Sequence, residues 1–333
     1  MSEEIDDALE LQDFLNNLTA IHSFSNGYLG VFWLCAHLDN KGYLDLDSDI
    51  YADFDELIDG FIAKSDFIKY DYMHQDLGVL HYIIERRDET RLKIVLNKLL
   101  STKINYGKFY VFEEIPEEVQ PTKTKTEINT GLSHGNASIL AFANICISQN
   151  LLRKEFTEMA NNFIGFYSSI FETATNKAII PNYIIQGEKS SSGKRLAWCY
   201  GDLGVLYQLL WTSILVENKS LELKMIDYWL GLAQYKVEDA KIHDACFCHG
   251  SAGIAYMFYK VYKKTNRPEF LASSKFWNQE MCTQLEHSKD TFYENEDWHE
   301  NNGLLLGKTG TDFVAKTLSG EMDSDWDRCF LLS

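Results

Sequence analysis

A short turn that opens an apolar helix occurs six times along this chain. The copies are NGYLGVFW (26–33), HQDLGVLH (74–81), HGNASILA (134–141), YGDLGVLY (200–207), HGSAGIAY (249–256) and LGKTGTDF (306–313). Most copies hold a G-x-x-G pair, and the exceptions are Gln75 and Ser138. Glycine at the start of a helix permits a tight turn and a close approach of two backbones. Since each interval between turns has room for two helices, the pattern predicts a repeat of paired helices.

Apolar residues at spacings of three and four predict helices over most of the chain. The helical stripes run through 77–100, 139–147, 156–171, 205–216, 221–232, 254–262 and 270–285. The polar stretches 101–129 and 176–194 hold three of the four prolines and are predicted to be long loops, with short strands such as 110–113. The same repeat continues on both sides of each loop. We therefore expect an all-α chain that forms a single domain over residues 1–333.

Paired helices that repeat six times can close into a ring of inner and outer helices or extend as an open solenoid. A solenoid normally keeps a steadier repeat length than this chain, whose turns fall at positions 27, 75, 135, 201, 250 and 307. The uneven spacing favours the closed ring. In such a ring the glycine turns would lie at one rim, and the polar residues beside them would surround a common cavity.

Charge and cysteine content exclude several classes of protein. Acidic residues number 49 against 31 lysines and arginines, and the net charge of -18 argues against nucleic acid or anionic lipid as a partner. The start, MSEEIDDALELQ, is acidic, unlike a signal peptide, and no apolar stretch approaches the ~20 residues that cross a bilayer. The seven cysteines are an odd number spread thinly, which does not describe a disulfide framework. We expect a cytoplasmic protein with reduced thiols and no transmembrane segment.

Several side chains beside the turns can carry chemistry. They are Asp71 and His74 before the second turn, His134 at the third, Arg195, Trp198, Cys199 and Tyr200 at the fourth, and Cys248 and His249 at the fifth. Two thiolates and an imidazole are a ligand set for zinc, and three protein ligands leave a fourth position open, as in catalytic sites. Cys199, Cys248 and His249 are the candidate ligands. Each of them alone is better explained as a buried core residue, but the set is not.

The phrases GLSHG, WCYG and CHGSAG resemble the signature of the lanthionine synthetase C-like cyclase family. The glycine repeat that accompanies them covers 26–313, nearly the whole chain. This resemblance implies an α/α toroid, a double ring of inner and outer helices. It also implies one zinc ion per chain, bound by Cys199, Cys248 and His249.

The resemblance also implies roles for residues outside the ligand set. His134 matches the histidine proposed for proton transfer, and Asp71 matches an active-site aspartate that would orient it or relay protons. Arg195 matches an active-site position whose charge would stabilise the enolate oxygen. Tyr200 matches a position that would orient the substrate. Cys246 lies two residues before the second cysteine and could compete for the metal, although the family pattern favours Cys248.

The activity implied by the resemblance is cyclisation of a dehydrated precursor peptide. A cysteine thiol of the peptide would add to dehydroalanine or dehydrobutyrine and form a lanthionine or methyllanthionine thioether ring. A lanthipeptide dehydratase and an export transporter are the further partners it suggests. The alternatives are addition of glutathione or another free thiol to dehydroamino acids, and a zinc-stabilised peptide-binding protein without turnover. A toroidal glycosidase with paired carboxylates finds no support in the turn motifs.

Overall fold

A computed structural model of the chain describes residues 22–113, 127–173, 180–185, 195–294 and 296–333. The acidic start and the serine-rich stretch 190–193 lie outside these ranges. The chain divides into two compact units, residues 1–103 and 104–333, and each is described by itself. Both units are built mainly of helices, as the sequence predicts.

The described part of the first unit, residues 22–103, contains two pairs of helices. They are α2 (Tyr28–Asn40), α3 (Ser48–Ala63), α4 (Val79–Glu85), which follows the 3-10 turn η1 (Asp76–Gly78), and α5 (Glu89–Leu100). Helix α4 packs against both α2 and α5. The stripe predicted over 77–100 is thus two helices, because the chain breaks at Arg87, whose φ of 53° is left-handed. The two turns of this unit are joined by a backbone hydrogen bond of 2.9 Å from Ser25 to Met73.

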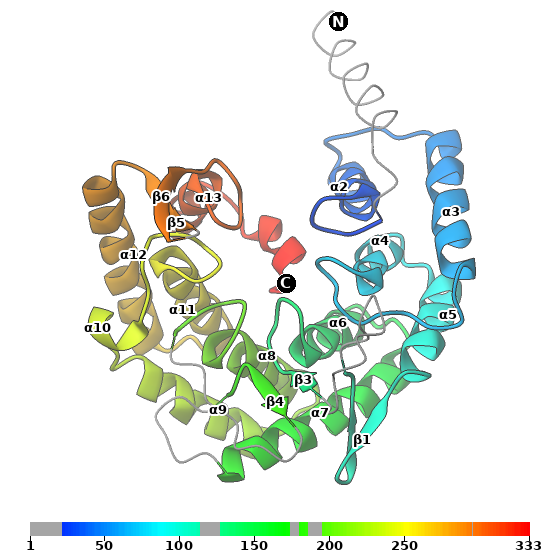
Figure 1. Cartoon of the computed structure of the whole chain (residues 1–333), viewed down its shortest axis with the longest axis horizontal. Helices are drawn as coiled ribbons and strands as arrows, with labels where there is room; N and C mark the ends of the chain where they lie inside the picture. Colours follow the sequence, from blue (N-terminus) through cyan, green and yellow to red (C-terminus); the bar gives the residue numbers. More distant parts are fainter. Residues whose placement is uncertain (1–21, 114–126, 174–179, 186–194, 295) are drawn as a thin grey trace, which may run out of the picture. The chain divides into compact units, whose positions relative to one another are not determined.

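The second unit contains two layers of helices (Figure 1). The inner helices are α6 (Asn136–Ser148), α8 (Asp202–Leu215), α11 (Ser251–Thr265) and α13 (Lys308–Ser319). The outer helices are α7 (Arg153–Thr173), α9 (Lys219–Leu232) and α12 (Pro268–Ser288), and the short α10 (Val237–Ala240) and the 3-10 segment η2 (Asp325–Phe330) follow α9 and α13. Inner helices pack in the order α6, α8, α11, α13, and each outer helix packs against the inner helix before it.

The pattern of apolar residues explains which helices are inner and which are outer. Helices α6 and α8 are buried over almost their whole surface, including polar residues such as Asn144 and Gln208, which hydrogen-bond each other at 3.0 Å. Helix α12 buries only one stripe, with Phe270, Trp277 and Met281 among its members. A helix that is apolar all round needs neighbours on every side, whereas an amphipathic helix covers the outside of a core.

Among the described residues of the second unit, the short strands form three antiparallel pairs. They are β1 (Ile104–Tyr106) with β2 (Phe109–Val111), β3 (Glu127–Asn129) with β4 (Tyr183–Ile185), and β5 (Thr291–Glu294) with β6 (Asp297–Glu300). The strand expected at 110–113 is β2, which begins one residue earlier and ends two residues earlier than predicted. In the second ladder, Asn129 is paired directly with Tyr183. That pair reaches the site described below.

Close backbone approach explains the second glycine of the turns. A Cβ atom on Gly253 would overlap the backbone oxygen of Phe247, and one on Gly204 would overlap that of Trp198. At the fourth turn, Gly201 has a φ of 83° and a ψ of -152°, a conformation open to glycine alone. The predicted role of the glycines as makers of tight turns is therefore confirmed in these repeats.

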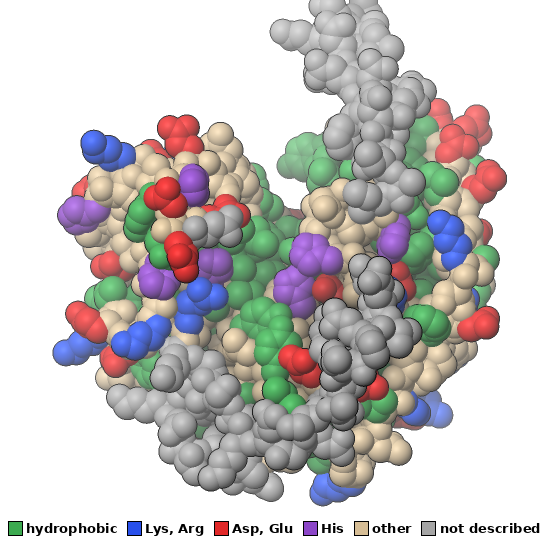
Figure 2. Space-filling model, in the orientation of Figure 1, with side chains coloured by type: hydrophobic (Ala, Val, Ile, Leu, Met, Phe, Trp, Pro, Cys, Tyr) green, Lys and Arg blue, Asp and Glu red, His purple; other side chains and the backbone are tan. Residues whose placement is uncertain are grey.

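The length and apolarity of the helices and the charges on the surface can be compared with the sequence composition. Among the helices that the structure describes, none is long and apolar enough to cross a membrane. On the face drawn in Figure 2, lysine and arginine side chains are scattered among acidic ones over the described residues.

Candidate metal centre and active site

The turns of the second unit are joined to one another in sequence order by backbone hydrogen bonds. The residue two before the first glycine of one turn donates its N–H to the carbonyl of the equivalent residue in the next turn. Ser133 donates to Cys199 (3.2 Å), Cys199 to Cys248 (3.4 Å) and Cys248 to Leu305 (3.0 Å). Cys199 and Cys248 therefore occupy equivalent positions in neighbouring repeats, and this is why residues far apart in sequence lie side by side.

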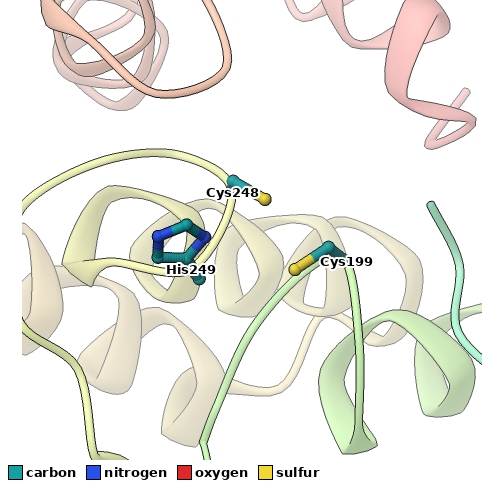
Figure 3. Close-up of side chains that lie close together, drawn as sticks. All are labelled: Cys199, Cys248 and His249. Atoms are coloured by element: carbon teal, nitrogen blue, oxygen red, sulfur yellow. The ribbon is translucent and has the colours of Figure 1, made fainter. Parts of the chain in front are cut away.

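The three predicted ligands come together in this unit. One possible ligand atom from each of Cys199, Cys248 and His249 lies within 4.8 Å of the others. Both cysteines are free thiols, 5% and 8% exposed. Figure 3 shows the two sulfur atoms on either side of a small space that one edge of the His249 ring also faces. Cys248 and His249 lie in a turn and not in a helix, as expected for sequence neighbours that can bind one ion.

The two thiols of the set influence each other strongly. A hydrogen bond from the Cys248 thiol lowers the pKa of Cys199 well below its usual range, and the His249 ring and the charge of Arg195 act in the same direction. The same hydrogen bond, together with burial, raises the pKa of Cys248. The pair thus releases one proton readily and holds the second. Two sulfurs and an imidazole at this spacing are a donor set suited to zinc.

A second group, Asp244, Cys246 and His249, also lies within 4.8 Å, but its groups are otherwise engaged. The two oxygens of Asp244 accept the backbone N–H groups of Cys246 (3.1 Å) and Tyr293 (2.8 Å). Burial raises the pKa of Cys246, whose thiol is also hydrogen-bonded to Asp244. This arrangement holds the loop before His249 in place, and it leaves the first set as the better candidate for the metal.

The position just before the first glycine supplies two further predicted residues. His134 and Tyr200 occupy this position in the third and fourth turns, and their ring centroids are 6.1 Å apart. His249 occupies the same position in the fifth turn. The second unit thus holds His134 and Tyr200 next to each other, and Tyr200 directly follows the candidate ligand Cys199.

The hydroxyl of Tyr200 has a fixed orientation. Asn129 accepts the backbone N–H of Gly131 through Oδ1 (3.0 Å), so its Nδ2 must be the atom that donates to the Tyr200 hydroxyl (3.0 Å). The Tyr183 hydroxyl lies 3.1 Å from the same oxygen. Burial, followed by the Tyr183 hydrogen bond, raises the pKa of Tyr200. The phenol is therefore protonated at neutral pH and can donate a hydrogen bond.

The two remaining predicted residues, Arg195 and Asp71, lie in different parts of the chain. Arg195 is half-buried, and its charge acts on the pKa of Cys199, so it belongs to the surroundings of the metal set. Asp71 lies in the first unit, where its Oδ1 accepts the backbone N–H groups of Met73 (2.8 Å) and His74 (3.1 Å). This carboxylate stabilises the second turn. Its predicted role in proton transfer stays a prediction.

Comparison with known proteins decides the family. The model of the family described as "Lanthionine synthetase C-like protein" matches residues 3–331. The chain belongs to this family. The family that the segments GLSHG, WCYG and CHGSAG resemble is therefore confirmed.

Two relatives support the assignment to the lanthionine synthetase C-like family. The chain is 28% identical over 268 residues to the nisin biosynthesis protein NisC of Lactococcus lactis subsp. lactis, which corresponds to 70% of this chain and 60% of that protein. The chain therefore matches less than two thirds of that relative's length. The solved structure of a nisin cyclase matches with a TM-score of 0.74 and 18% identity over 99% of this chain and 85% of that one. This match shows the fold, and the predicted α/α toroid class is confirmed.

Sequence reasoning missed three residues of this candidate site. Asn129 and Tyr183 orient Tyr200, and Asp244 holds the loop that carries His249. An aspartate or asparagine two residues before the backbone N–H it accepts forms a local Asx turn, so Asn129 and Asp244 had a recognisable signal. Tyr183 had none, because it reaches the site through the pairing of two short strands.

Proposed function

We propose that the protein is a zinc-dependent lanthipeptide cyclase. It would add a cysteine thiol of a dehydrated precursor peptide to a dehydroalanine or dehydrobutyrine of the same peptide. The observation that carries the proposal is the convergence of Cys199, Cys248 and His249 in the unit that also pairs His134 with Tyr200. A structural zinc site alone would require neither of the latter two residues.

The donor set supports one zinc ion per chain, held by Cys199, Cys248 and His249. Three protein ligands leave a fourth position for substrate. A zinc ion bound there would lower the pKa of a coordinated peptide thiol and so supply the thiolate that a free cysteine, with a pKa of about 8.5, provides only in small amount at neutral pH. The buried position of both cysteines would shield this centre from bulk water.

The remaining steps belong to side chains of this chain. The peptide sulfur forms a bond to the β-carbon, and the electron pair of the carbon–carbon double bond moves toward the carbonyl and gives an enolate. The positive charge of Arg195 would stabilise the enolate oxygen, and Tyr200 would position the substrate through its hydroxyl. The imidazole of His134 would take up the proton that the peptide thiol releases and deliver a proton to the α-carbon, steps typical of histidine as a general base and acid. Asp71 would orient His134 or relay the proton to it.

The wider setting is part of the same proposal. The dehydrated precursor implies a dehydratase that acts before this protein, and the cyclised product implies an export transporter after it. We place these steps in the cytoplasm.

Thiol protection in a dehydrated peptide tests the proposal. A synthetic peptide with one dehydroalanine and one cysteine would be incubated with the zinc-loaded protein, alkylated with iodoacetamide and weighed by mass spectrometry. Ring closure leaves the mass unchanged and protects the thiol, so we expect an unalkylated product of unchanged mass. The same peptide with serine in place of dehydroalanine, and the Cys248→Ala protein, should both leave the thiol open to alkylation.

Two other outcomes would contradict the proposal. With glutathione present, a product heavier by one glutathione and a peptide thiol still open to alkylation would identify the protein as a free-thiol transferase. A peptide that binds to the protein but stays unchanged under all conditions would identify a zinc-stabilised binding protein.

A further inference from the structure

An aromatic side chain directly precedes each candidate zinc cysteine, and both contact one ring from a distant part of the chain. Trp198 precedes Cys199 and Phe247 precedes Cys248, and both rings are fully buried. Phe330, the last residue of η2, stacks on Phe247 at 4.5 Å and 22°, and meets Trp198 edge-on at 5.2 Å and 65°. We propose that Phe330 is a positioning residue that sets the separation of the two cysteine loops. This inference rests on the proposed zinc-binding function.

Hydrogen bonds connect the same three elements. The indole Nε1 of Trp198 donates to the backbone oxygen of Phe330 at 3.1 Å, inside the protein. The backbone N–H of Trp198 donates to the carbonyl of Cys248 at 3.0 Å. Because a buried indole N–H without a partner is costly, these bonds restrict how Trp198 can turn. Through Trp198, the position of Phe330 is therefore linked to the backbone of both cysteines.

The segment that carries Phe330 is itself held firmly by helix α11. Asp327 is fully buried, and its carboxylate forms an ion pair of 2.6 Å with Lys260 and accepts a hydrogen bond of 2.7 Å from Tyr256. Removing one partner of such a buried pair is strongly destabilising. Helix α11 is the helix that begins directly after Cys248 and His249, so the anchor and the metal turn share one rigid element.

Helix α8 holds the residues that follow Phe330. Gln208 donates to the carbonyl of Leu331 and Tyr207 donates to that of Leu332, each at 2.7 Å. Helix α8 begins directly after the turn that carries Cys199 and Tyr200. The segment 327–332 thus bridges the two helices that follow the two cysteine turns, and Phe330 lies at the point where those turns meet.

The precise distances that a metal ion requires of its ligands explain why the bridge formed by segment 327–332 matters. Metal–ligand distances are tolerated only within about 0.2 Å of their ideal values. A cavity in place of the Phe330 ring would let the loops before Cys199 and Cys248 shift by more than that. Loss of an outer residue that orients metal ligands typically weakens metal binding by about 10–100-fold.

Zinc affinity of Phe330 variants, in the full chain, tests the inference. The dissociation constant for zinc would be measured by competition with a chromophoric chelator, at a temperature where each metal-free variant is folded by circular dichroism. We expect Phe330→Ala to raise this constant about 10–100-fold, and the bulkier Phe330→Leu to raise it less. The matched control is Phe163→Ala, which removes an equally buried ring from the outer helix α7, where it contacts Phe112 and Tyr167.

The two Phe→Ala variants should lose comparable thermal stability, yet only Phe330→Ala should lose zinc affinity. Unchanged zinc affinity in Phe330→Ala, or an equal loss of affinity in Phe163→Ala, would show that Phe330 is an ordinary core residue. Either result would overturn this inference and leave the proposed function standing. A wild-type protein that binds no zinc would overturn the proposed function and, with it, this inference.

Discussion

At the residue scale, one position of the repeated turn supplies three polar side chains, two imidazoles and one phenol. His134, Tyr200 and His249 each stand directly before the first glycine of their turn, in successive repeats. The side chains differ in the groups that surround them. His249 stands beside Cys248 and shares its space with the sulfur atoms, while Tyr200 is fixed by hydrogen bonds and faces His134. A repeat fold can therefore bring side chains proposed for metal binding, hydrogen bonding and acid-base chemistry to equivalent positions of successive turns.

His134 should act on the proton and not on the metal. We expect His134→Ala to retain its zinc and its fold but to lose roughly 10²–10⁴ in the rate of ring closure, the usual contribution of a positioned acid-base group. Zinc content and rate would be measured on the same preparation, with Cys248→Ala as the variant that loses both. Loss of zinc from His134→Ala would make the residue a ligand, and an unimpaired rate would exclude it as the proton donor.

Asp71 has a structural role in its turn that can be separated from a chemical one. Its Oδ1 accepts two backbone N–H groups, and asparagine has an oxygen in the same place. We expect Asp71→Asn to keep the melting temperature of the wild type and to lower the rate of ring closure less than His134→Ala does. Asp71→Ala should lower both, since it leaves the N–H groups without their acceptor. An Asp71→Asn protein with the full wild-type rate would show that the carboxylate charge takes no part in the reaction.

At the element scale, the start of each inner helix depends on close backbone contact. Gly253 lies in the first turn of α11, and a Cβ atom on it would overlap the backbone oxygen of Phe247. We expect Gly253→Ala to lower the free energy of unfolding by about 1–3 kcal/mol, the usual cost of overpacking. It should also weaken zinc binding, because Phe247 directly precedes Cys248. Chemical denaturation and the chelator competition would measure the two effects.

Helix α9 offers a matched control for that substitution. Gly231 is exposed near the end of α9, and nothing lies within 4 Å of a Cβ built on it. Gly231→Ala should leave zinc binding unchanged and raise stability by up to about 1 kcal/mol, because alanine is the better helix former. Equal effects of the two substitutions would mean that the contact at Gly253 has no special importance.

The helices could be predicted from the sequence because apolar spacing is a local property. All seven predicted stripes correspond to described helices, and the stripe over 77–100 divides where Arg87 takes a left-handed conformation. The proximity of the candidate ligands Cys199, Cys248 and His249 was predictable because each cysteine stands in a recognisable turn motif. Tyr183 and Phe330 were not, because strand pairing and ring contacts join them to residues 17 and more positions away, and no local pattern records such contacts.

At the scale of the whole molecule, the sequence predicts one domain, while the described residues form two compact units. We retain the single domain as a proposal and expect one cooperative unfolding transition. Trp33 is the one tryptophan before residue 104 in the sequence. The tryptophan fluorescence of a Trp33→Phe protein therefore reports on residues 104–333, and circular dichroism reports on all helices. The two thermal transitions should coincide, and a separate transition seen by circular dichroism alone would indicate two domains.

The metal content of the whole chain tests the central claim most directly. We expect purified wild-type protein to contain about one zinc per chain by elemental analysis. Cys199→Ala and Cys248→Ala should be depleted of zinc, whereas Cys246→Ala, which alters a neighbouring buried thiol outside the proposed ligand set, should retain it. Full zinc occupancy in both Cys199→Ala and Cys248→Ala, or depletion in Cys246→Ala alone, would contradict the assignment of the metal centre and the mechanism built on it.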